Sequence, residues 1–386
     1  MSKMNKRKWE KKLGLVVFVL PLTCLIILES ASVTVEARVN GSCFNCHTIH
    51  NSQDGSQLNV GGTNPYLLQG EGDACVGCHS SEDNRTIIDL GGGSLVPIVN
   101  NSAAPDYPPN DSETSSLAGG NFYWVKSLGD AYGHNCLSVD GIEIDVALAD
   151  GAPGRPNDAQ GASCDGCHIR LDGCESCHKA AHHADDSAAV VGESGGWYRF
   201  LHSSQHGGSQ AGVVGIEDAD WEQTVSATDH NEYNGCNNPN GSSDNSMSDY
   251  CAGCHHDFHG VMYTDSATGN DWDNESPWYR HPTHLPLPTS SDKDYHLYNT
   301  SDGINVGPYS PEAPIARDPA DLTGMSSSSS LVTPGKDQVF CLSCHRVHGS
   351  PYPDILRWDY TSMLAGRPDA DAVGHGCFVC HTTKDE

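Results

Sequence analysis

The sequence repeats one pentapeptide, Cys-x-x-Cys-His, seven times within 386 residues. The repeats use 14 of the 17 cysteines, as the pairs Cys43 and Cys46, Cys75 and Cys78, Cys164 and Cys167, Cys174 and Cys177, Cys251 and Cys254, Cys341 and Cys344, and Cys377 and Cys380. The histidines that follow are His47, His79, His168, His178, His255, His345 and His381. Two thiols three positions apart can reach both vinyl groups of one porphyrin, which holds the next imidazole under the iron. The repeats therefore predict seven covalently attached c-type haems, with these cysteines as thioether donors and these histidines as proximal iron ligands.

Zinc sites and disulfide frameworks also use Cys-x-x-Cys pairs, but neither needs a histidine directly after the second cysteine. Histidine makes up only 21 of the 386 residues, so seven such coincidences would be very rare. A redox-active Cys-x-x-Cys is expected once, beside a βαβ pattern. The repeats thus favour haem over both alternatives.

Fourteen histidines remain for the second axial position of each iron, whereas only four methionines follow residue 37. Bis-histidine ligation is therefore the simplest assignment, and the scarcity of methionine favours low reduction potentials. The preferred distal candidates are His50, His134, His182 or His183, His206, His259, His281 and His348. In reserve are His202, His256, His284 and His375, while His230 and His296 are expected to face solvent.

Two distal candidates lie three residues after a proximal histidine: His50 after His47, and His348 after His345. On a helical turn such neighbours share one face, about 5–6 Å apart. They cannot bind opposite sides of one porphyrin, but they can bind two neighbouring haems. Each His-x-x-His therefore predicts two closely placed haems.

Residues 1–37 have the pattern of a secretory signal peptide: a basic start, an apolar stretch over 13–28, and small residues up to Ala37. Cleavage after Ala37 would leave residues 38–386 as one seven-haem domain. A membrane anchor is the alternative, but 16 residues interrupted by Pro21 are short for a span, which needs about 20. We expect an exported protein, in the periplasm or at the outer surface or beyond, with no transmembrane anchor after cleavage.

The charge is strongly acidic, with 21 basic and 50 acidic residues and a formal net charge of −29. Such a surface repels a phosphate backbone, which excludes nucleic acid as a partner. A redox partner is expected to be basic at its docking face, with an association that salt weakens. Other redox proteins and mineral oxides both remain possible acceptors.

The 41 glycines and 21 prolines predict abundant loops. The expected fold is mostly irregular, with short α-helices around the haem motifs, a small β element and a core built on haem. Alternating apolar residues over 142–148 predict a strand that pairs with residues 122–125. Of the remaining cysteines, Cys136 and Cys236 are expected to form a disulfide in an oxidising compartment, the alternative being two separate thiols.

The Cys-x-x-Cys-His-x-x-His spacing that begins at Cys43 and at Cys341 resembles that of the doubled-motif multihaem cytochromes c of metal- and sulfate-respiring bacteria. Segments 197–201, 215–218, 250–255, 278–282 and 341–350 are also similar to this group. The resemblance implies bis-histidine haems in closely packed chains, which carry electrons across the periplasm or outward from the cell. Some members polymerise into extracellular filaments through a histidine donated to a neighbour's haem.

Three functions follow from these patterns. A multihaem electron carrier is favoured, and no catalytic residue is assigned. A subunit of an extracellular cytochrome filament is the alternative, because haem motifs lie six residues after the predicted cleavage and five residues before the end of the chain. A haem reductase needs an open iron position, which nothing in the histidine-rich sequence requires, so it is the least favoured.

Overall fold

The computed structural model describes residues 39, 41–58, 62–63, 65, 67–69, 74–105, 117–142, 173–185, 187–202, 212–237, 245–253, 255, 283, 286–289, 296–361, 363 and 374–382. The chain divides into two compact units, Met1–Glu36 and Ala37–Glu386, and all described residues belong to the second. Several predicted site residues lie outside the described ranges: Cys164, Cys167, His168, Cys254, His206, His259 and His281. Among the described residues, no helix is long and apolar enough to cross a membrane.

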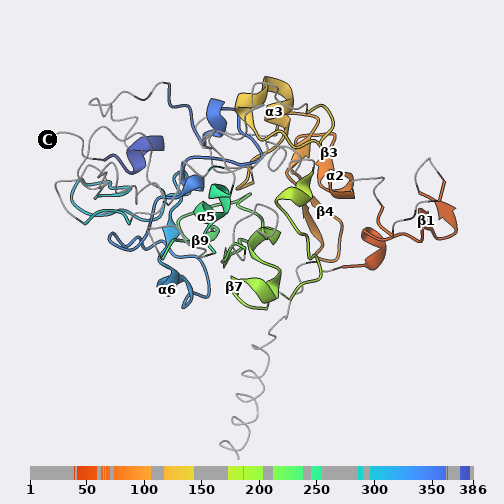
Figure 1. Cartoon of the computed structure of the whole chain (residues 1–386), viewed down its shortest axis with the longest axis horizontal. Coiled ribbons are helices and arrows are strands. Elements are labelled where there is room, and N and C mark those ends of the chain that lie inside the picture. The colour runs from red at the N-terminus through yellow and green to blue at the C-terminus, as the bar shows by residue number, and fades with distance from the viewer. Residues whose placement is uncertain are drawn as a thin grey trace, which may run out of the picture. The chain divides into compact units, whose positions relative to one another are not determined.

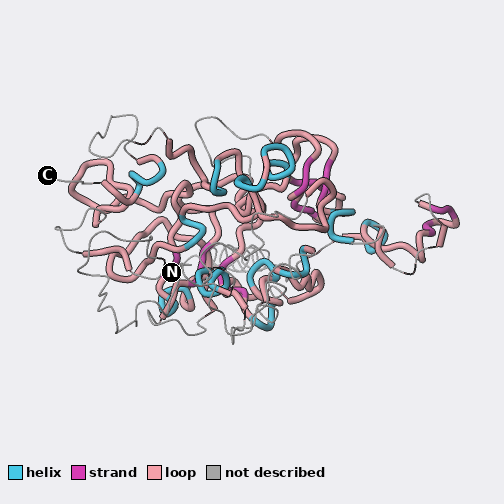
Figure 2. The backbone as a smooth tube through the Cα atoms, turned by 45° about the horizontal axis from the view of Figure 1, so that its top comes forward, coloured by secondary structure: helices cyan, strands magenta, loops and turns pink. Residues whose placement is uncertain are grey.

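Loops and turns connect very short helices and strands (Figure 2). The described α-helices are α2 (Ala74–Cys78), α3 (Tyr123–Leu128), α5 (Met247–Ala252) and α6 (Pro319–Leu322). The 3₁₀ turns are η1 (Cys43–Asn45), η2 (Asp130–Tyr132), η5 (Cys174–Ser176), η6 (Glu193–Gly195), η7 (Tyr198–Phe200), η10 (Cys341–Ser343), η11 (Pro353–Ile355) and η12 (Gly376–Val379). This confirms the expected loop-rich fold with short helices and small β elements.

The largest described sheet has four strands in the order β10-β9-β8-β7, with β10 parallel to β9 and the other pairs antiparallel. Figure 1 labels β7 and β9 of this sheet. Its strands are β7 (Val190–Val191), β8 (Gly215–Ile216), β9 (Glu232–Asn234) and β10 (Ala316–Arg317). Three two-stranded pairs complete the set: β1 (Ser52–Gln53) with β2 (Ser56–Gln57), β3 (Ser80–Ser81) with β6 (Asn100–Asn101), and β4 (Ile87–Asp89) with β5 (Leu95–Pro97).

The apolar core consists of three small clusters, and each packs against cysteines of the haem motifs. The first contains Tyr298, Tyr309 and Trp358 and contacts Cys344 and Cys380. The second surrounds Tyr198 and Tyr233 and contacts Cys177 and Cys251. The third surrounds Phe122 and Cys136 and contacts Cys174. The residues that would hold haem are therefore built into the core of the fold.

The predicted strand over residues 122–125 is wrong, because Tyr123–Leu128 forms helix α3. Phe122 and Val125, three positions apart, share one helical face and pack with Cys136 and Val139. Gly129, with φ of +102°, ends the helix by donating its N–H to the Val125 carbonyl at 3.0 Å. Most of the predicted partner strand, residues 143–148, lies outside the described residues.

Candidate haem sites

Six motifs form a helical turn that ends at the motif histidine, although Cys254 of the fifth lies outside the described residues. The backbone N–H of the motif histidine donates to the carbonyl of the first cysteine four residues earlier, at 2.8–3.2 Å. The turn places the two cysteines, three positions apart, on one side of the backbone. This local geometry fits two thioether bonds to a single porphyrin edge, with the histidine ring beside it.

Four of the motif histidines are oriented by a backbone carbonyl. The Nδ1 atoms of His79, His178, His345 and His47 lie 2.7, 2.8, 3.0 and 3.2 Å from the carbonyl oxygens of Pro97, Arg199, Asp354 and Leu67. A carbonyl only accepts, so Nδ1 carries the proton and Nε2 keeps the lone pair that binds a metal. Burial also lowers the pKa of His79, His178 and His345, which favours the neutral imidazole that serves as a ligand.

Four motif histidines face a second histidine from elsewhere in the chain. The ring centres are 6.2 Å apart for His47 and His183, 6.3 Å for His79 and His182, 6.0 Å for His178 and His348, and 6.1 Å for His255 and His134. A metal–imidazole bond is about 2.0–2.1 Å, so two imidazoles on opposite sides of one metal have ring centres roughly 6 Å apart. The four spacings therefore fit one iron between each pair.

One short segment contributes one histidine to each of three of these pairs. His178, His182 and His183 face His348, His79 and His47 respectively. His348 thus faces His178, not His345, which precedes it by three residues. The segment from Cys174 to His183 consequently joins the second, fourth and first motifs, counted along the chain.

Two distal candidates are held tightly by their surroundings. His134 donates from Nδ1 to the carbonyl of Val347 at 2.6 Å, and burial together with nearby His255 lowers its pKa. The His348 ring lies 4.8 Å from that of Phe122, and burial lowers its pKa to about 3. A Cβ at Gly119 would lie 3.0 Å from Nδ1 of His348, so a glycine here leaves room for the ring.

Contacts between motif residues connect neighbouring motifs. Cys75 of the second motif contacts Cys174 of the fourth. Tyr250, next to the fifth motif, donates its hydroxyl to the Cys177 carbonyl of the fourth at 2.7 Å. Burial, reinforced by the neighbouring thiols of Cys377 and Cys341, raises the pKa of Cys344 to about 12, which places the sixth and seventh motifs together.

The remaining histidines have varied surroundings. His50 is exposed, and its backbone has a φ of +53°. Nδ1 of His375, a reserve candidate, lies 3.0 Å from Oε2 of Glu312. His230, expected to face solvent, is instead 2% exposed. That expectation is wrong because Glu232 and Tyr309 contact its ring, and the contact with Tyr309 joins residues far apart in the sequence.

The expected disulfide between Cys136 and Cys236 does not form in the structure. Cys136 is buried in the third apolar cluster beside Cys174. Sγ of Cys236 lies 3.2 Å from the hydroxyl of Ser246. The disulfide is expected from the sequence only because an oxidising compartment permits one. In the structure, the two thiols pack among different neighbours.

The donor set fits haem c: paired thiols on one turn, a neutral imidazole beside them and a second imidazole at the spacing of one iron. Among the described residues, no group of three or more histidines, cysteines and acidic residues gathers as one zinc ion would require.

Comparisons with known proteins also indicate a c-type cytochrome. Residues 333–386 match the family model described as the doubled CXXCH motif. The C-type cytochrome OmcS of Geobacter sulfurreducens is 25% identical over 393 residues, which cover 87% of this chain and 82% of the relative.

Two solved structures are also similar. The outer membrane cytochrome S filament from Geobacter sulfurreducens has a TM-score of 0.48 and 21% identity, over 90% of this chain and 95% of that one. The OmcS nanowires of the same organism, solved by cryo-EM, have a TM-score of 0.46 and 19% identity, over 90% and 100%. The family match and the curated relative confirm the resemblance of this chain to the multihaem c-type cytochromes with a doubled CXXCH motif.

Proposed function

We propose that this chain is an exported cytochrome that carries electrons along seven bis-histidine c-type haems. The observation that carries the proposal is the set of four histidine pairs whose ring centres lie 6.0–6.3 Å apart, each with a motif histidine as one member. Bound haem supplies one-electron chemistry at its iron. The chain's own residues fix the position, the axial ligands and the surroundings of each group.

The pairs assign axial ligands to four haems, numbered here by motif. His47 and His183 would hold haem 1, His79 and His182 haem 2, His178 and His348 haem 4, and His255 and His134 haem 5. Imidazole on both sides leaves no iron position open at these four haems. This argues against a reductase, which needs such a position for its substrate, and for a carrier.

The contacts between motifs supply a continuous order for these haems. The segment from Cys174 to His183 would tie haems 1, 2 and 4 together, and the Tyr250–Cys177 hydrogen bond ties haem 4 to haem 5. Nearby His345 contributes to the lowered pKa of His134, which supports a position of haem 6 beside haem 5. Cys344 and Cys380 pack against the same apolar cluster, which supports a position of haem 7 beside haem 6. The chain would thus hold haems 1, 2, 4, 5, 6 and 7 as neighbours in that order.

The surroundings of the haems suit a low-potential carrier outside the cytoplasm. The net charge of −29 favours the oxidised, more positive state of each iron and a partner with a basic docking face. The export signal pattern over residues 1–37 supports a periplasmic or extracellular location.

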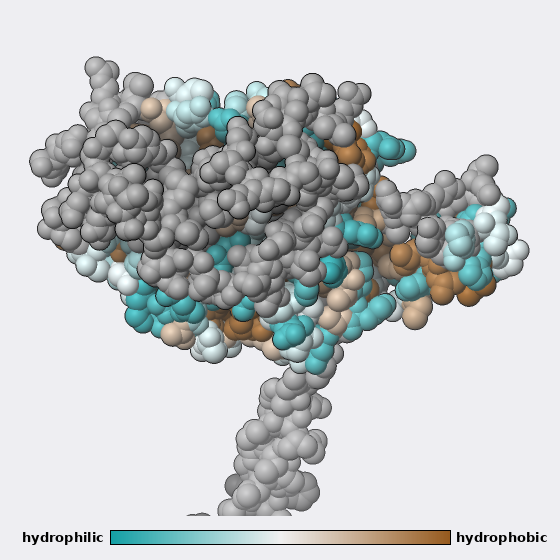
Figure 3. Space-filling model, in the orientation of Figure 1, coloured by the Kyte–Doolittle hydropathy of each residue, from teal (hydrophilic) through white to brown (hydrophobic). Residues whose placement is uncertain are grey.

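A filament subunit is the second candidate, favoured by apolar side chains on the segment over residues 41–69. Phe44 is 61% exposed and Ile49 73% exposed, and Leu58, Leu67 and Leu68 are exposed as well. Apolar residues are visible on the segment that carries β1 in Figure 3. An exposed apolar patch of this kind is typical of a surface that contacts another protein. Electron microscopy of the secreted protein decides between the candidates, since monodisperse particles would exclude the filament.

The proposed ligands can be tested one at a time. Replacing His183 by Ala removes one axial ligand of haem 1, so we expect one haem to change from low-spin to high-spin in the EPR spectrum. Lys179→Ala is the matched control, because Lys179 is exposed, lies in the same segment and is not a histidine ligand. Its spectrum should stay low-spin. An unchanged spectrum for His183→Ala would contradict the assignment.

A further inference from the structure

Four charged side chains form a buried cluster beside the four-stranded sheet. His230, Glu232, Arg317 and Asp337 are at most 3% exposed. Arg317 donates from Nε to Oε2 of Glu232 at 2.6 Å and from Nη1 to Oδ2 of Asp337 at 3.1 Å. Nε2 of His230 lies 3.2 Å from Oε1 of Glu232. Charges this deeply buried must be compensated within the protein.

Both ring nitrogens of His230 face oxygen atoms that can only accept. Nδ1 lies 2.9 Å from the backbone carbonyl of Ser226, and Nε2 faces the carboxylate of Glu232. A neutral imidazole has one N–H and can satisfy only one of these contacts, whereas an imidazolium satisfies both. With His230 protonated, two positive and two negative side chains balance. Without that proton, the cluster keeps an excess of one negative charge.

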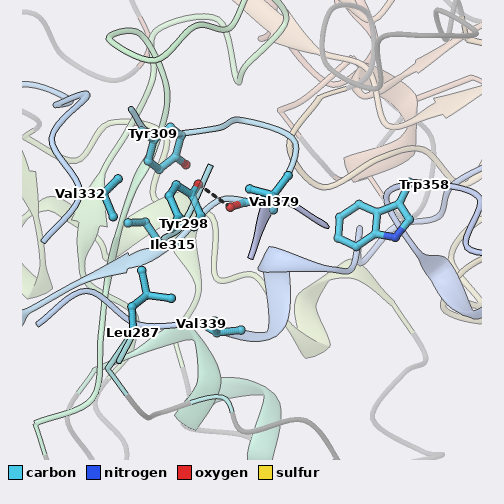
Figure 4. Packing of buried hydrophobic residues seen from close by; sticks show 9 residues of the cluster. Leu287, Tyr298, Tyr309, Ile315, Val332, Val339, Trp358 and Val379 are labelled. Atoms are coloured by element: carbon cyan, nitrogen blue, oxygen red, sulfur yellow. Dashed lines mark hydrogen bonds between the residues drawn. The ribbon is translucent and has the colours of Figure 1, made fainter. Parts of the chain in front are cut away.

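Tyr309 connects this cluster to the haem motifs. Its ring stacks on that of His230, with centres 3.5 Å apart and planes inclined by 6°. The Arg317 guanidinium carbon lies 5.4 Å from the centre of the same ring. Tyr309 also belongs to the apolar cluster with Tyr298 and Val379 that packs against Cys344 and Cys380 (Figure 4). The buried charges therefore contact, through Tyr309, the same apolar cluster that packs against cysteines of the sixth and seventh motifs.

We propose that His230 is a proton-binding site linked to reduction of the haems at the sixth and seventh motifs. The inference rests on the proposed function, since it needs haem at these motifs. Each haem iron takes one electron from an external donor and loses one unit of positive charge. His230 takes one proton from solvent and returns its cluster to neutrality. The two events favour each other because opposite charges attract strongly in a low-dielectric interior.

Hydrogen bonds hold the other charged and titratable groups that the structure describes around His230. Glu232 accepts from the backbone N–H of Ser329 and Asp337 accepts from that of Thr333, both at 2.7 Å. Glu222 accepts from the backbone N–H of Asn231 at 2.9 Å. Tyr298, in the same apolar cluster as Tyr309, donates its hydroxyl to the Ala313 carbonyl at 2.8 Å. Among these described groups, His230 is the only imidazole.

The test is a potentiometric titration of the haem-loaded protein, followed by absorbance at several pH values between about 5 and 8, where histidine titrates. In the unmutated protein, the midpoint reduction potential of the haems nearest His230 should fall as pH rises. Loss of the His230 proton leaves the cluster more negative, which favours the oxidised iron. In His230→Gln, whose amide can still donate to Glu232, the midpoint reduction potential of these haems should no longer depend on pH. Tyr309→Phe is the matched control: it keeps the ring, its hydroxyl has no hydrogen-bond partner among the described residues, and its pH dependence should persist.

A second measurement needs no variant. Full reduction of the unmutated protein in weakly buffered solution should take up protons, read with a pH indicator. If no protons are taken up, or if His230→Gln keeps the pH dependence of the unmutated protein, the inference is wrong. Both results leave the proposed function intact as long as the haems remain low-spin. Loss of low-spin haem in the unmutated protein would instead contradict the proposed function itself.

Discussion

A chain prepared without haem should show no cooperative unfolding transition and should behave as a disordered polymer. The described helices have at most six residues and most described strands have two, so local structure alone cannot hold the fold. All three apolar clusters pack against motif cysteines, which places haem where a conventional domain has its core. Folding is then coupled to cofactor binding, as in metal-dependent domains.

Circular dichroism and urea titration of the haem-free chain, produced in cells that lack haem attachment, check this expectation. The haem-loaded protein is the control and should unfold cooperatively. A sigmoidal transition in the haem-free chain, with native-like secondary structure, would show that the side chains alone suffice.

Arg317→Ala should be the most destabilising single substitution in the buried charge cluster, by about 3–5 kcal/mol of unfolding free energy. It leaves Glu232 and Asp337 buried and without their shared cation. Burial alone would raise the pKa of Glu232, but hydrogen bonds with His230 and Arg317 outweigh it and lower this pKa. A carboxylate with a lowered pKa stabilises the fold above its unfolded-state pKa, and this stabilisation is lost as pH falls through the folded-state pKa. The variant should therefore lose more stability at neutral than at strongly acidic pH.

Lys336→Ala is the matched control for this substitution. Lys336 forms an ion pair with Asp321 at 2.7 Å, but their side chains are 49% and 44% exposed. Solvent screens such a pair, so we expect Lys336→Ala to lose much less stability than Arg317→Ala. The two haem-loaded variants are compared by the urea concentration at which each is half unfolded. Equal losses of stability would show that the buried cluster contributes no more to stability than a surface ion pair.

The haem motifs could be predicted from the sequence because their chemistry depends on local spacing. Cys-x-x-Cys-His places its three haem-binding residues within one turn, and in six motifs the motif histidine closes that turn on the first cysteine. The His-x-x-His spacing likewise predicted that His345 and His348 serve different haems, and His348 faces His178 in the structure. These arguments need only the geometry of three or four consecutive residues.

Long-range contacts could not be predicted in this way. His134 faces His255, which lies 121 positions later in the sequence, and His230 stacks on the distant Tyr309. From the sequence, His230 is expected at the surface and Cys136 is expected to bond with Cys236, because neither burial nor thiol pairing is encoded locally. Helix α3 shows the same limit, since Phe122 and Val125 have good strand propensity but pack as neighbours on one helical face.

Low-temperature EPR of the oxidised protein, with haem and protein quantified on the same sample, tests the central claim most directly. The account predicts seven haems per chain, essentially all of them low-spin with two imidazole ligands. High-spin iron amounting to one haem in seven would reveal a replaceable ligand and contradict a carrier in which every iron is held by two histidines.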